Sequence, residues 1–444
     1  SDVCSSDLRR RKPKAKTYEL NIESLSHEGR GIAHLDEKVI FVSGALPGET
    51  VLADRTFSRA KFEEADVKEV LKPAENRIAP KCEVFGVCGG CSFQHLSSED
   101  QIGAKGEWLK DAFKGQAKIE PKHWLEPLQV QSWGYRRKAR LGVRYVAKKE
   151  KVLVGFREKK SGFITNMSRC EVLHPSLGDN LEVLAKYIEQ LSVKSQVPQL
   201  EVAVAENDTV LILRHLEPLT EQDEQILLVC ANELKINFYT QSGGADTVKP
   251  LDQPALLTYS HPDHDIVMEF LPTDFTQVNF KLNQKMINLA LEMLDLNEKD
   301  EVIDLFCGLG NFTLPIAKYA RHVVGVEGDL GLIERAKYNA EQNAISNADF
   351  YKADLFKEVE GFEWFRGKNY NKALIDPARS GAIEIVELLP KLGVERLVYV
   401  SCNPATLARD TDKLIELGYK LDTAGVMDMF PQTAHVESIA LFTK

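Results

Sequence analysis

The sequence has no long apolar run and little cysteine. No stretch approaches the roughly 18 consecutive apolar residues that a membrane-spanning helix needs. Residues 1–16 are charged and lack the apolar core of a secretory signal, so we predict a cytoplasmic protein with no membrane partner. Eight cysteines in 444 residues are too few for a disulfide scaffold. These absences exclude the membrane, secreted and fibrous classes.

The charge is divided unevenly along the chain. Hydrophobic residues make up 43% and charged residues 27%, as in ordinary globular proteins, and the length predicts two or three domains. Residues 1–170 contain 32 Lys and Arg against 23 Asp and Glu, whereas residues 171–444 contain 24 against 43. This asymmetry indicates either a basic docking half joined to an acidic half with another task, or two solvated surfaces of opposite sign.

The N-terminal part predicts an arm and a small barrel. Residues 1–16 carry six basic side chains and almost nothing apolar, which predicts a flexible basic arm that can touch phosphates. Residues 17–72 contain several short alternating runs separated by glycine turns, which predict a small β-barrel. Such barrels are common as nucleic-acid-binding platforms, and they are also common as inert spacers.

Residues 73–262 predict a strand-rich central domain, with one helix near residues 99–114 that is able to pack on the next domain. Between Arg136 and Lys160 there are eleven basic and two acidic residues, with Tyr135, Tyr145 and Phe156 interleaved. Basic side chains attract a phosphate backbone and aromatic rings stack on unpaired bases, so this segment favours RNA. The alternative is a solvated basic β-ribbon.

Residues 263–444 predict an α/β domain. Runs such as EVIDLF, HVVGVE, NKALID and ERLVYVS alternate with helical patterns at residues 311–320, 330–344, from about 383, and 406–417. This alternation is typical of a doubly wound parallel sheet with helices on both faces. Ligands bind at the carboxyl ends of the strands in such a sheet.

The first predicted strand-to-helix turn has the features of a nucleoside site. It places Gly308 and Gly310 after a strand, and about twenty residues later Glu327 ends the next strand, where a carboxylate can accept both ribose hydroxyls. A dinucleotide site would have a third glycine where Thr313 stands. The pattern therefore favours S-adenosylmethionine over NAD, and the alternative is a plain tight turn.

Two residues near other strand ends are candidates for covalent chemistry. Cys402 lies just before a predicted helix, whose dipole is expected to lower the thiol pKa and favour the thiolate. A thiolate that adds to carbon 6 of a pyrimidine makes carbon 5 nucleophilic, and a base must then remove the carbon 5 proton. Glu437 in the C-terminal TAHVES segment can serve as that base, or it is an exposed loop carboxylate.

Six motifs together resemble the RNA uracil-5-methyltransferase family: FTQVN at 275–279, DLFCGLGNF at 304–312, VVGVEGD, DPARSG, SCNPATLARD and HVES. The resemblance implies a Rossmann-like S-adenosylmethionine-dependent methyltransferase domain over residues 263–444. It implies that Cys402 is the nucleophile and Glu437 the base. The cofactor contacts that it implies are Gln277, Phe306, Asn311, Glu327, Asp354 and Asp376, of which Asp354 stands where the family holds Asn or Asp.

A cysteine cluster lies outside these motifs. Cys82, Cys88 and Cys91 crowd into ten positions, and Cys170 is the best candidate for a fourth ligand. Four thiolates suit zinc or an iron–sulfur cluster, and their spacing does not separate the two. The family's ribosomal RNA branch carries a [4Fe–4S] cluster on this pattern and its tRNA branch lacks one. The resemblance therefore implies a [4Fe–4S] cluster.

Together these features resemble the branch that acts on 23S ribosomal RNA, with a TRAM-like RNA-binding barrel at residues 17–72. We expect a monomer that methylates carbon 5 of a uridine. The alternatives are methylation of another rRNA site or of tRNA, methylation of cytosine or of an exocyclic amine, and a metal-bearing RNA-binding protein without transferase activity.

Overall fold

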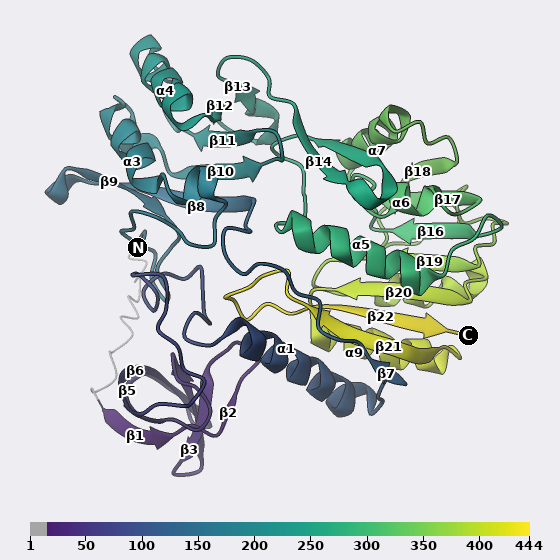
Figure 1. The fold of residues 1–444 in the computed structure, drawn as a ribbon, viewed down its shortest axis with the longest axis horizontal. Coiled ribbons are helices and arrows are strands. Elements are labelled where there is room, and N and C mark those ends of the chain that lie inside the picture. Colours follow the sequence, from purple (N-terminus) through teal and green to yellow (C-terminus); the bar gives the residue numbers. More distant parts are fainter. Residues whose placement is uncertain (1–15) are drawn as a thin grey trace, which may run out of the picture.

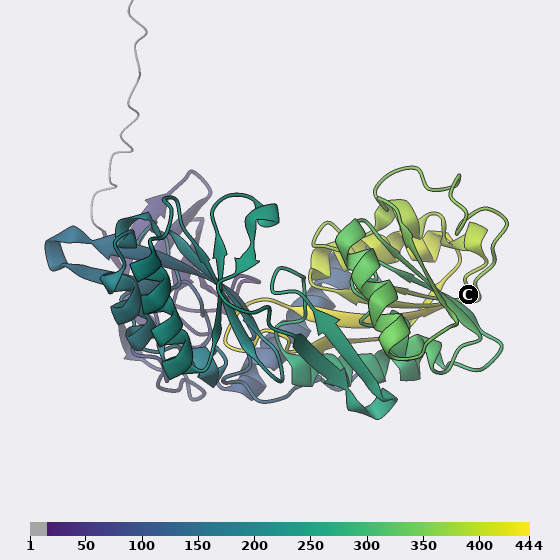
Figure 2. The same ribbon diagram turned by 90° about the horizontal axis from the view of Figure 1, so that it is seen from above.

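The computed structural model describes residues 16–444, which form two lobes seen side by side in Figure 2. One lobe combines an N-terminal sheet with a central sheet, and the other holds the C-terminal sheet. Except for Lys16, the predicted basic arm lies outside the described residues. No helix in the described part of the chain is long and apolar enough to cross a membrane.

The N-terminal unit is the predicted small β-structure. Its six-stranded sheet has the order β1-β5-β6-β4-β3-β2 and curls around its own apolar core (Figure 1). Alternating side chains enter that core, as in β1, where Tyr18 and Leu20 are buried between exposed neighbours. The strands are β1 (Thr17–Asn21), β2 (Ser24–Leu25), β3 (Gly31–Leu35), β4 (Lys38–Ser43), β5 (Thr50–Ser58) and β6 (Phe62–Lys72).

The central unit contains a second six-stranded sheet, of order β13-β12-β11-β10-β8-β9, as the strand-rich pattern predicts. Three helices that we did not predict, α2 (Pro175–Gly178), α3 (Leu181–Gln190) and α4 (Glu221–Leu234), belong to this unit. Its strands are β8 (Lys138–Val146), β9 (Lys151–Gly155), β10 (Gln199–Val204), β11 (Thr209–Arg214), β12 (Asn237–Gln241) and β13 (Lys249–Pro250).

A hairpin and a helix connect the central unit to the C-terminal lobe. The hairpin of β14 (Leu257–His261) and β15 (Ile266–Phe270) shares an apolar core with the C-terminal helix α7 (Leu330–Gln342). The helix α5 (Phe280–Leu294) follows, capped by the Asn279 side chain. Neither the hairpin nor α5 was predicted.

The C-terminal lobe confirms the predicted doubly wound α/β fold. Its eight-stranded sheet has the order β18-β17-β16-β19-β20-β22-β21-β7, with parallel pairing from β18 to β20. Only β22 runs antiparallel to both of its neighbours. The strands are β16 (Glu301–Leu305), β17 (His322–Glu327), β18 (Ala348–Lys352), β19 (Lys372–Ile375), β20 (Arg396–Ser401), β21 (Lys420–Met427) and β22 (Glu437–Thr443).

The helices of this lobe are shorter than predicted in two places. The helix expected at residues 311–320 is α6 (Thr313–Ala317), because Gly308 and Gly310 adopt positive φ angles of 56° and 94° and keep the preceding turn open. The helix expected from about 383 is the single turn α8 (Ile383–Val386). The helix α9 (Pro404–Glu416) begins two residues before its predicted start, with Asn403 as its cap.

An upstream segment completes the C-terminal lobe. The helix α1 (Ser98–Ala112) lies along this lobe in Figure 1, next to β21 and α9. Its buried Ile102, Trp108 and Leu109 belong to the same apolar core as those elements. The short strand β7 (His123–Trp124) pairs with β21 at the sheet edge. Residues 98–124 therefore belong to the second lobe in space, although the central domain follows them in sequence.

Candidate active site

The candidate residues gather at one edge of the C-terminal sheet. The parallel strands β16, β17, β19 and β20 all end there, which places the loops after each of them side by side. The antiparallel strand β22 begins at this same edge, and its Ser438 pairs with Ser401 at the end of β20. This register brings Glu437 next to Cys402, although 34 residues separate the two in sequence.

Glu327 joins the two turns of the predicted cofactor site. Its carboxylate accepts backbone N–H groups from Gly308 at 3.2 Å, Gly328 at 2.7 Å and Asp329 at 3.0 Å. These bonds orient the carboxylate at the end of β17 without using all of its acceptor capacity. The arrangement is able to present a carboxylate oxygen to a pair of hydroxyl groups.

Asp304 forms the floor of the same turn. It is fully buried, and the Thr313 hydroxyl donates to one carboxylate oxygen at 2.5 Å. Burial, followed by the nearby charges of Asp376 and Glu327, raises the pKa of Asp304 to about 8. Asp304 begins the DLFCGLGNF motif and was not predicted as a site residue. An acidic residue at the end of a buried strand was the signal that could have selected it.

The other predicted cofactor residues have different surroundings. Phe306 has a positive φ of 66° and its ring centroid lies 5.6 Å from that of Phe356. Asn311 exchanges two hydrogen bonds of 2.9 Å with Asn283 and accepts one from the Tyr259 hydroxyl at 3.0 Å. Its amide is therefore fixed by α5 and β14.

Gln277 and Asp354 lie in the loops that flank this region. Gln277 is half-buried just before α5. Asp354 is exposed after β18, where it forms an ion pair with Lys357 at 2.9 Å and accepts the backbone N–H of Phe356 at 3.2 Å. An exposed carboxylate with one flexible partner remains available to a ligand.

Cys402 lies at the junction of β20 and α9 and is half-buried. Burial, Glu437 and Asp376 raise its pKa to about 11, against the opposing effect of Arg379. The expected thiolate is therefore wrong for the free protein. A helix N-terminus contributes only about 0.3–1 kcal/mol, less than one pKa unit, which is too little to offset burial and two carboxylates.

Glu437 is buried, with 5% of its surface exposed, and is not the loop carboxylate that the sequence left as an alternative. Burial and Asp376 raise its pKa well above the usual value, and Arg379 and Lys105 oppose that shift. Burial also raises the pKa of Asp376 to about 7. The site thus holds two carboxyl groups and a thiol that bind protons near neutral pH.

Arg379 connects the loops that carry these groups. Its guanidinium donates to Nδ1 of His435 at 3.0 Å, and its carbonyl accepts the Asn403 side chain at 3.0 Å. Burial and then the neighbouring Arg379 charge lower the pKa of His435 to about 4, so its neutral ring accepts this bond. Arg379 is the only one of these groups that stays cationic and exposed at the mouth of the site.

The four predicted cysteine ligands line one cavity, which Phe85, Phe156 and Met167 close. Cys88, Cys91 and Cys170 are buried and Cys82 is half-buried. Burial raises the pKa of Cys91 to about 12 and that of Cys170 to about 11, and the neighbouring thiols add to both shifts. Among residues 16–444, however, no group of three or more His, Cys, Asp or Glu side chains has an arrangement that could hold a metal ion.

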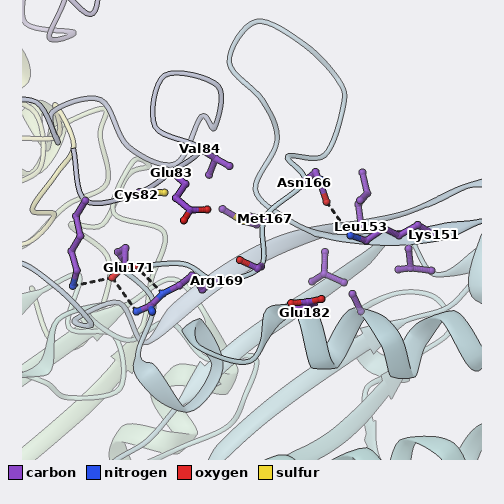
Figure 3. Close-up of a pocket in the computed structure, with 15 residues that line it drawn as sticks. Cys82, Glu83, Val84, Lys151, Leu153, Asn166, Met167, Arg169, Glu171 and Glu182 are labelled. Carbon is purple, nitrogen blue, oxygen red and sulfur yellow. Dashed lines mark hydrogen bonds and ion pairs between the residues drawn. The ribbon is translucent and has the colours of Figure 1, made fainter. Parts of the chain in front are cut away.

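A second pocket adjoins this cavity and shares Cys82, Met167 and Glu171 with it. Figure 3 shows the pocket between the cysteine loop and β9, with Cys82 at its rim and the Arg169–Glu171 ion pair of 2.8 Å beside it. Cys82 is thus the cysteine of the cluster that solvent reaches most easily.

The basic segment at residues 136–160 is less open than the sequence predicted. Tyr135 is buried and its hydroxyl donates to Pro431 O at 2.9 Å, so this ring cannot stack on a base. Arg137 and Lys138 donate to the carbonyls of Ala205 and Pro272, at 2.6 and 2.7 Å. The exposed positive charge comes from other members of the segment: Arg140, Arg144, Lys148, Lys149, Lys151, Arg157 and Lys160.

Two family models match the chain. Residues 185–444 match tRNA (Uracil-5-)-methyltransferase, and residues 11–68 match the TRAM domain. The chain is 74% identical over 436 residues to a protein of Vesicomyosocius okutanii subsp. Calyptogena okutanii (strain HA) named 23S rRNA (uracil(1939)-C(5))-methyltransferase RlmD, covering 98% of this chain and 99% of the relative. A protein of the same name from Alcanivorax borkumensis is 48% identical over 440 residues, covering 98% of this chain and 99% of the relative.

A solved structure is similar over almost the whole chain. It is the Pyrococcus abyssi tRNA (uracil-54, C5)-methyltransferase in complex with S-adenosyl-L-homocysteine, with a TM-score of 0.74 and 20% sequence identity. The match covers 96% of this chain and 99% of the archaeal one, so the two share their fold throughout.

Proposed function

The chain belongs to the tRNA (uracil-5-)-methyltransferase family, and we propose that it methylates carbon 5 of a uridine in 23S rRNA with S-adenosylmethionine as the methyl donor. The relatives with 74% and 48% identity over almost the whole chain carry the name of that activity. Action on ribosomal RNA is consistent with the predicted cytoplasmic location.

The observation that supports this chemistry most directly is the meeting of Cys402 and Glu437 at the sheet edge where the cofactor turn also lies. Carbon 5 of uracil is a weak nucleophile until a group adds to carbon 6. A thiol and a carboxyl group on adjacent strands supply the two functions that such a reaction needs.

The proposed covalent cycle uses these two residues in turn. The Cys402 thiol gives its proton to solvent and its sulfur forms a bond to carbon 6. The electrons of the carbon 5–carbon 6 double bond move onto the carbonyl at carbon 4 as an enolate. Those electrons return through carbon 5, which becomes methylated. Glu437 then takes the carbon 5 proton, the double bond re-forms, and the carbon–sulfur bond breaks to release the cysteine. Glu437 must be ionised at that moment, which the opposing charges of Arg379 and Lys105 favour.

S-adenosylmethionine, when bound, supplies a methyl group on a sulfonium and leaves as S-adenosylhomocysteine, the molecule present in the archaeal structure of the same fold. The described residues fit such a ligand. The carboxylate of Glu327 is held in place by three N–H groups, and the backbone at Gly308 has open space beside it. Phe306 offers a ring at the edge of this turn. We propose that Gln277, Asn311, Asp354 and Asp376 complete this set.

We infer further that Cys82, Cys88, Cys91 and Cys170 hold a [4Fe–4S] cluster. Their convergence on one cavity supports a shared ligand. Four thiols are the ligand set that a [4Fe–4S] cluster uses. The cluster would order the central fold, because it ties the loop at residues 82–91 to the segment before α2.

We propose that RNA is held by the N-terminal barrel, whose residues match a TRAM domain, and by the exposed basic side chains of residues 140–160. Phosphates attract these charges without regard to sequence. The target uridine must leave its stack to reach Cys402, since carbon 6 is inaccessible in a helix.

The test uses anaerobically purified protein, S-adenosylmethionine and separate transcripts of 23S rRNA and tRNA, with nuclease digestion and mass spectrometry to locate the methyl group. We expect 5-methyluridine in 23S rRNA alone. Cys402→Ala should abolish transfer, and Glu437→Gln should accumulate a covalent protein–RNA adduct on denaturing gels. Cys230→Ala, a buried cysteine of α4, and Glu416→Gln, an exposed carboxylate of α9, are the matched controls.

A methyl group only on tRNA would overturn the proposed substrate but keep the chemistry. Full turnover by Cys402→Ala would overturn the covalent cycle. No methyl group on either RNA would favour an RNA-binding protein without transferase activity.

A further inference from the structure

The loop at residues 428–436, which leads directly into Glu437, is held by side chains that lie more than 290 residues earlier in the chain. Lys105 and Gln101 of α1, the backbone of Ser92 and Phe93, and the Tyr135 hydroxyl all bind it. Contacts from residues 92–135 therefore hold the loop that precedes the proposed catalytic carboxylate.

Lys105 makes the most unusual of these contacts. It is completely buried, and its ammonium donates to Asp428 Oδ1 at 2.7 Å and to Phe430 O at 3.1 Å. A lysine is almost never fully buried without a partner, and burying an ion pair requires both charges to leave water. Replacement of such a pair by apolar residues is often neutral or stabilising, so stability alone gives little reason for it.

Gln101, one turn before Lys105, fixes the next part of the loop. Its side chain donates to the Gln432 side chain at 3.0 Å and accepts the Gln432 backbone N–H at 2.9 Å. Gln432 has a positive φ of 69°, which non-glycine residues rarely adopt, and its carbonyl accepts the N–H groups of Ser92 and Phe93. Contacts from outside the loop thus keep it in a conformation that it would seldom adopt alone.

The titratable and charged groups around Glu437 come from three elements. Asp376 and Arg379 face it from the loop after β19, Cys402 from the end of β20, and Lys105 from α1. Lys105 in turn faces Asp428 and His435. Of the two cations, Arg379 is exposed at the mouth, whereas Lys105 is enclosed, so solvent and salt screen the field of Lys105 far less.

We propose that Lys105 is a positioning residue for the proposed base Glu437, because it anchors the loop before Glu437 and places a buried positive charge beside the carboxylate. The inference rests on the proposed function of Glu437. Without the charge of Lys105, the carboxylate binds its proton more tightly, so fewer molecules hold it ionised at neutral pH. Adduct formation by Cys402 does not depend on this step, whereas removal of the carbon 5 proton does.

The test follows single turnovers with a transcript that carries tritium at carbon 5 of the target uridine. Tritium release measures proton removal, and denaturing gels measure the adduct. The first variant is Lys105→Met. If it folds poorly, the double variant Lys105→Met with Asp428→Asn replaces it, because this variant leaves no unpaired buried charge. Lys110→Met, which removes a half-buried lysine of the same helix that pairs with Glu107, is the control.

In the variant that folds, we expect the adduct to form at a rate close to that of the unchanged protein. Tritium release should be slower by roughly three- to tenfold at pH 7 and should recover at higher pH, because the pH profile moves upward. A folded variant whose pH profile of tritium release matches that of Lys110→Met would overturn the inference. Glu437→Gln separates the two hypotheses: if it forms no lasting adduct while the unchanged protein methylates RNA, the proposed role of Glu437 has failed, and not merely that of Lys105.

Discussion

The thiol of Cys402 is expected to react slowly with alkylating agents in the free protein. With a pKa of about 11, a fraction on the order of 0.001 is thiolate at pH 8, whereas about a quarter of an ordinary cysteine with a pKa near 8.5 is ionised. A more basic thiolate is also more nucleophilic, by roughly tenfold for this difference. The two effects leave alkylation about 20-fold slower than for a free cysteine peptide.

The assay is alkylation by iodoacetamide over pH 7 to 10, with mass spectrometry of the peptide that contains Cys402. The rate should rise tenfold per pH unit across most of this range. Glu437→Gln removes the carboxylate that contributes most to the shift after burial, so it should lower the thiol pKa. Because the less basic thiolate is also less nucleophilic, alkylation at pH 9 should be faster by roughly two- to threefold. Asp412→Asn, an exposed change on α9, should have no effect. A rate that is already constant between pH 7 and 9 would show an ionised thiol and refute the reasoning.

Two further predictions concern other parts of the chain. Anaerobically purified protein should contain about four iron atoms and show the visible absorbance of a cluster, and Cys170→Ser should lower both; one zinc ion per chain would contradict the cluster. In the barrel, the buried Glu63 accepts hydrogen bonds from Tyr18, Ser58 and Lys38, which overcome the opposing effect of burial and lower its pKa from 4.5 to about 2. Because the folded-state pKa is depressed, this stabilisation, at most about 3 kcal/mol, is present above pH 4.5 and is lost as the pH falls towards 2. Urea titrations should therefore give a lower free energy of unfolding at pH 3 than at pH 7 for the unchanged protein, and a smaller difference for Glu63→Gln. An equal pH dependence in the two proteins would contradict the lowered pKa of Glu63.

The strand-end residues could be predicted from sequence because a parallel sheet follows a simple rule. Each buried run ends at the same edge, so the residues after it, Glu327 and Cys402 among them, must lie together. This rule does not predict the position of Glu437, because only the antiparallel pairing of β22 with β20 brings Glu437 to that edge. The motif resemblance supplied that placement, and periodicity did not.

The missed helices of the central unit were visible in the sequence. In α3 the buried residues Leu181, Leu184, Ala185 and Ile188 follow the helical spacing, and α4 begins with a capping box at Thr220. The abundance of β-branched residues in the flanking strands outweighed these signals. The thiol pKa could not be predicted in the same way, because it depends on burial and on charges from two other segments, the loop after β19 and the start of β22. Neither contribution has a local sequence signature.

The contacts of α1 show why part of an active site stays invisible to sequence reasoning. The sequence does not distinguish Lys105 from an ordinary exposed lysine of a surface helix. Lys105 also lies 323 positions before its partner Asp428. Only the folded chain reveals that this helix lies under the loop before Glu437 and that its lysine is enclosed. The catalytic lobe is therefore incomplete without residues 98–124. A fragment that begins at residue 263 would keep Cys402, Glu437 and the proposed cofactor turn, but would lose the contacts that hold the loop before Glu437.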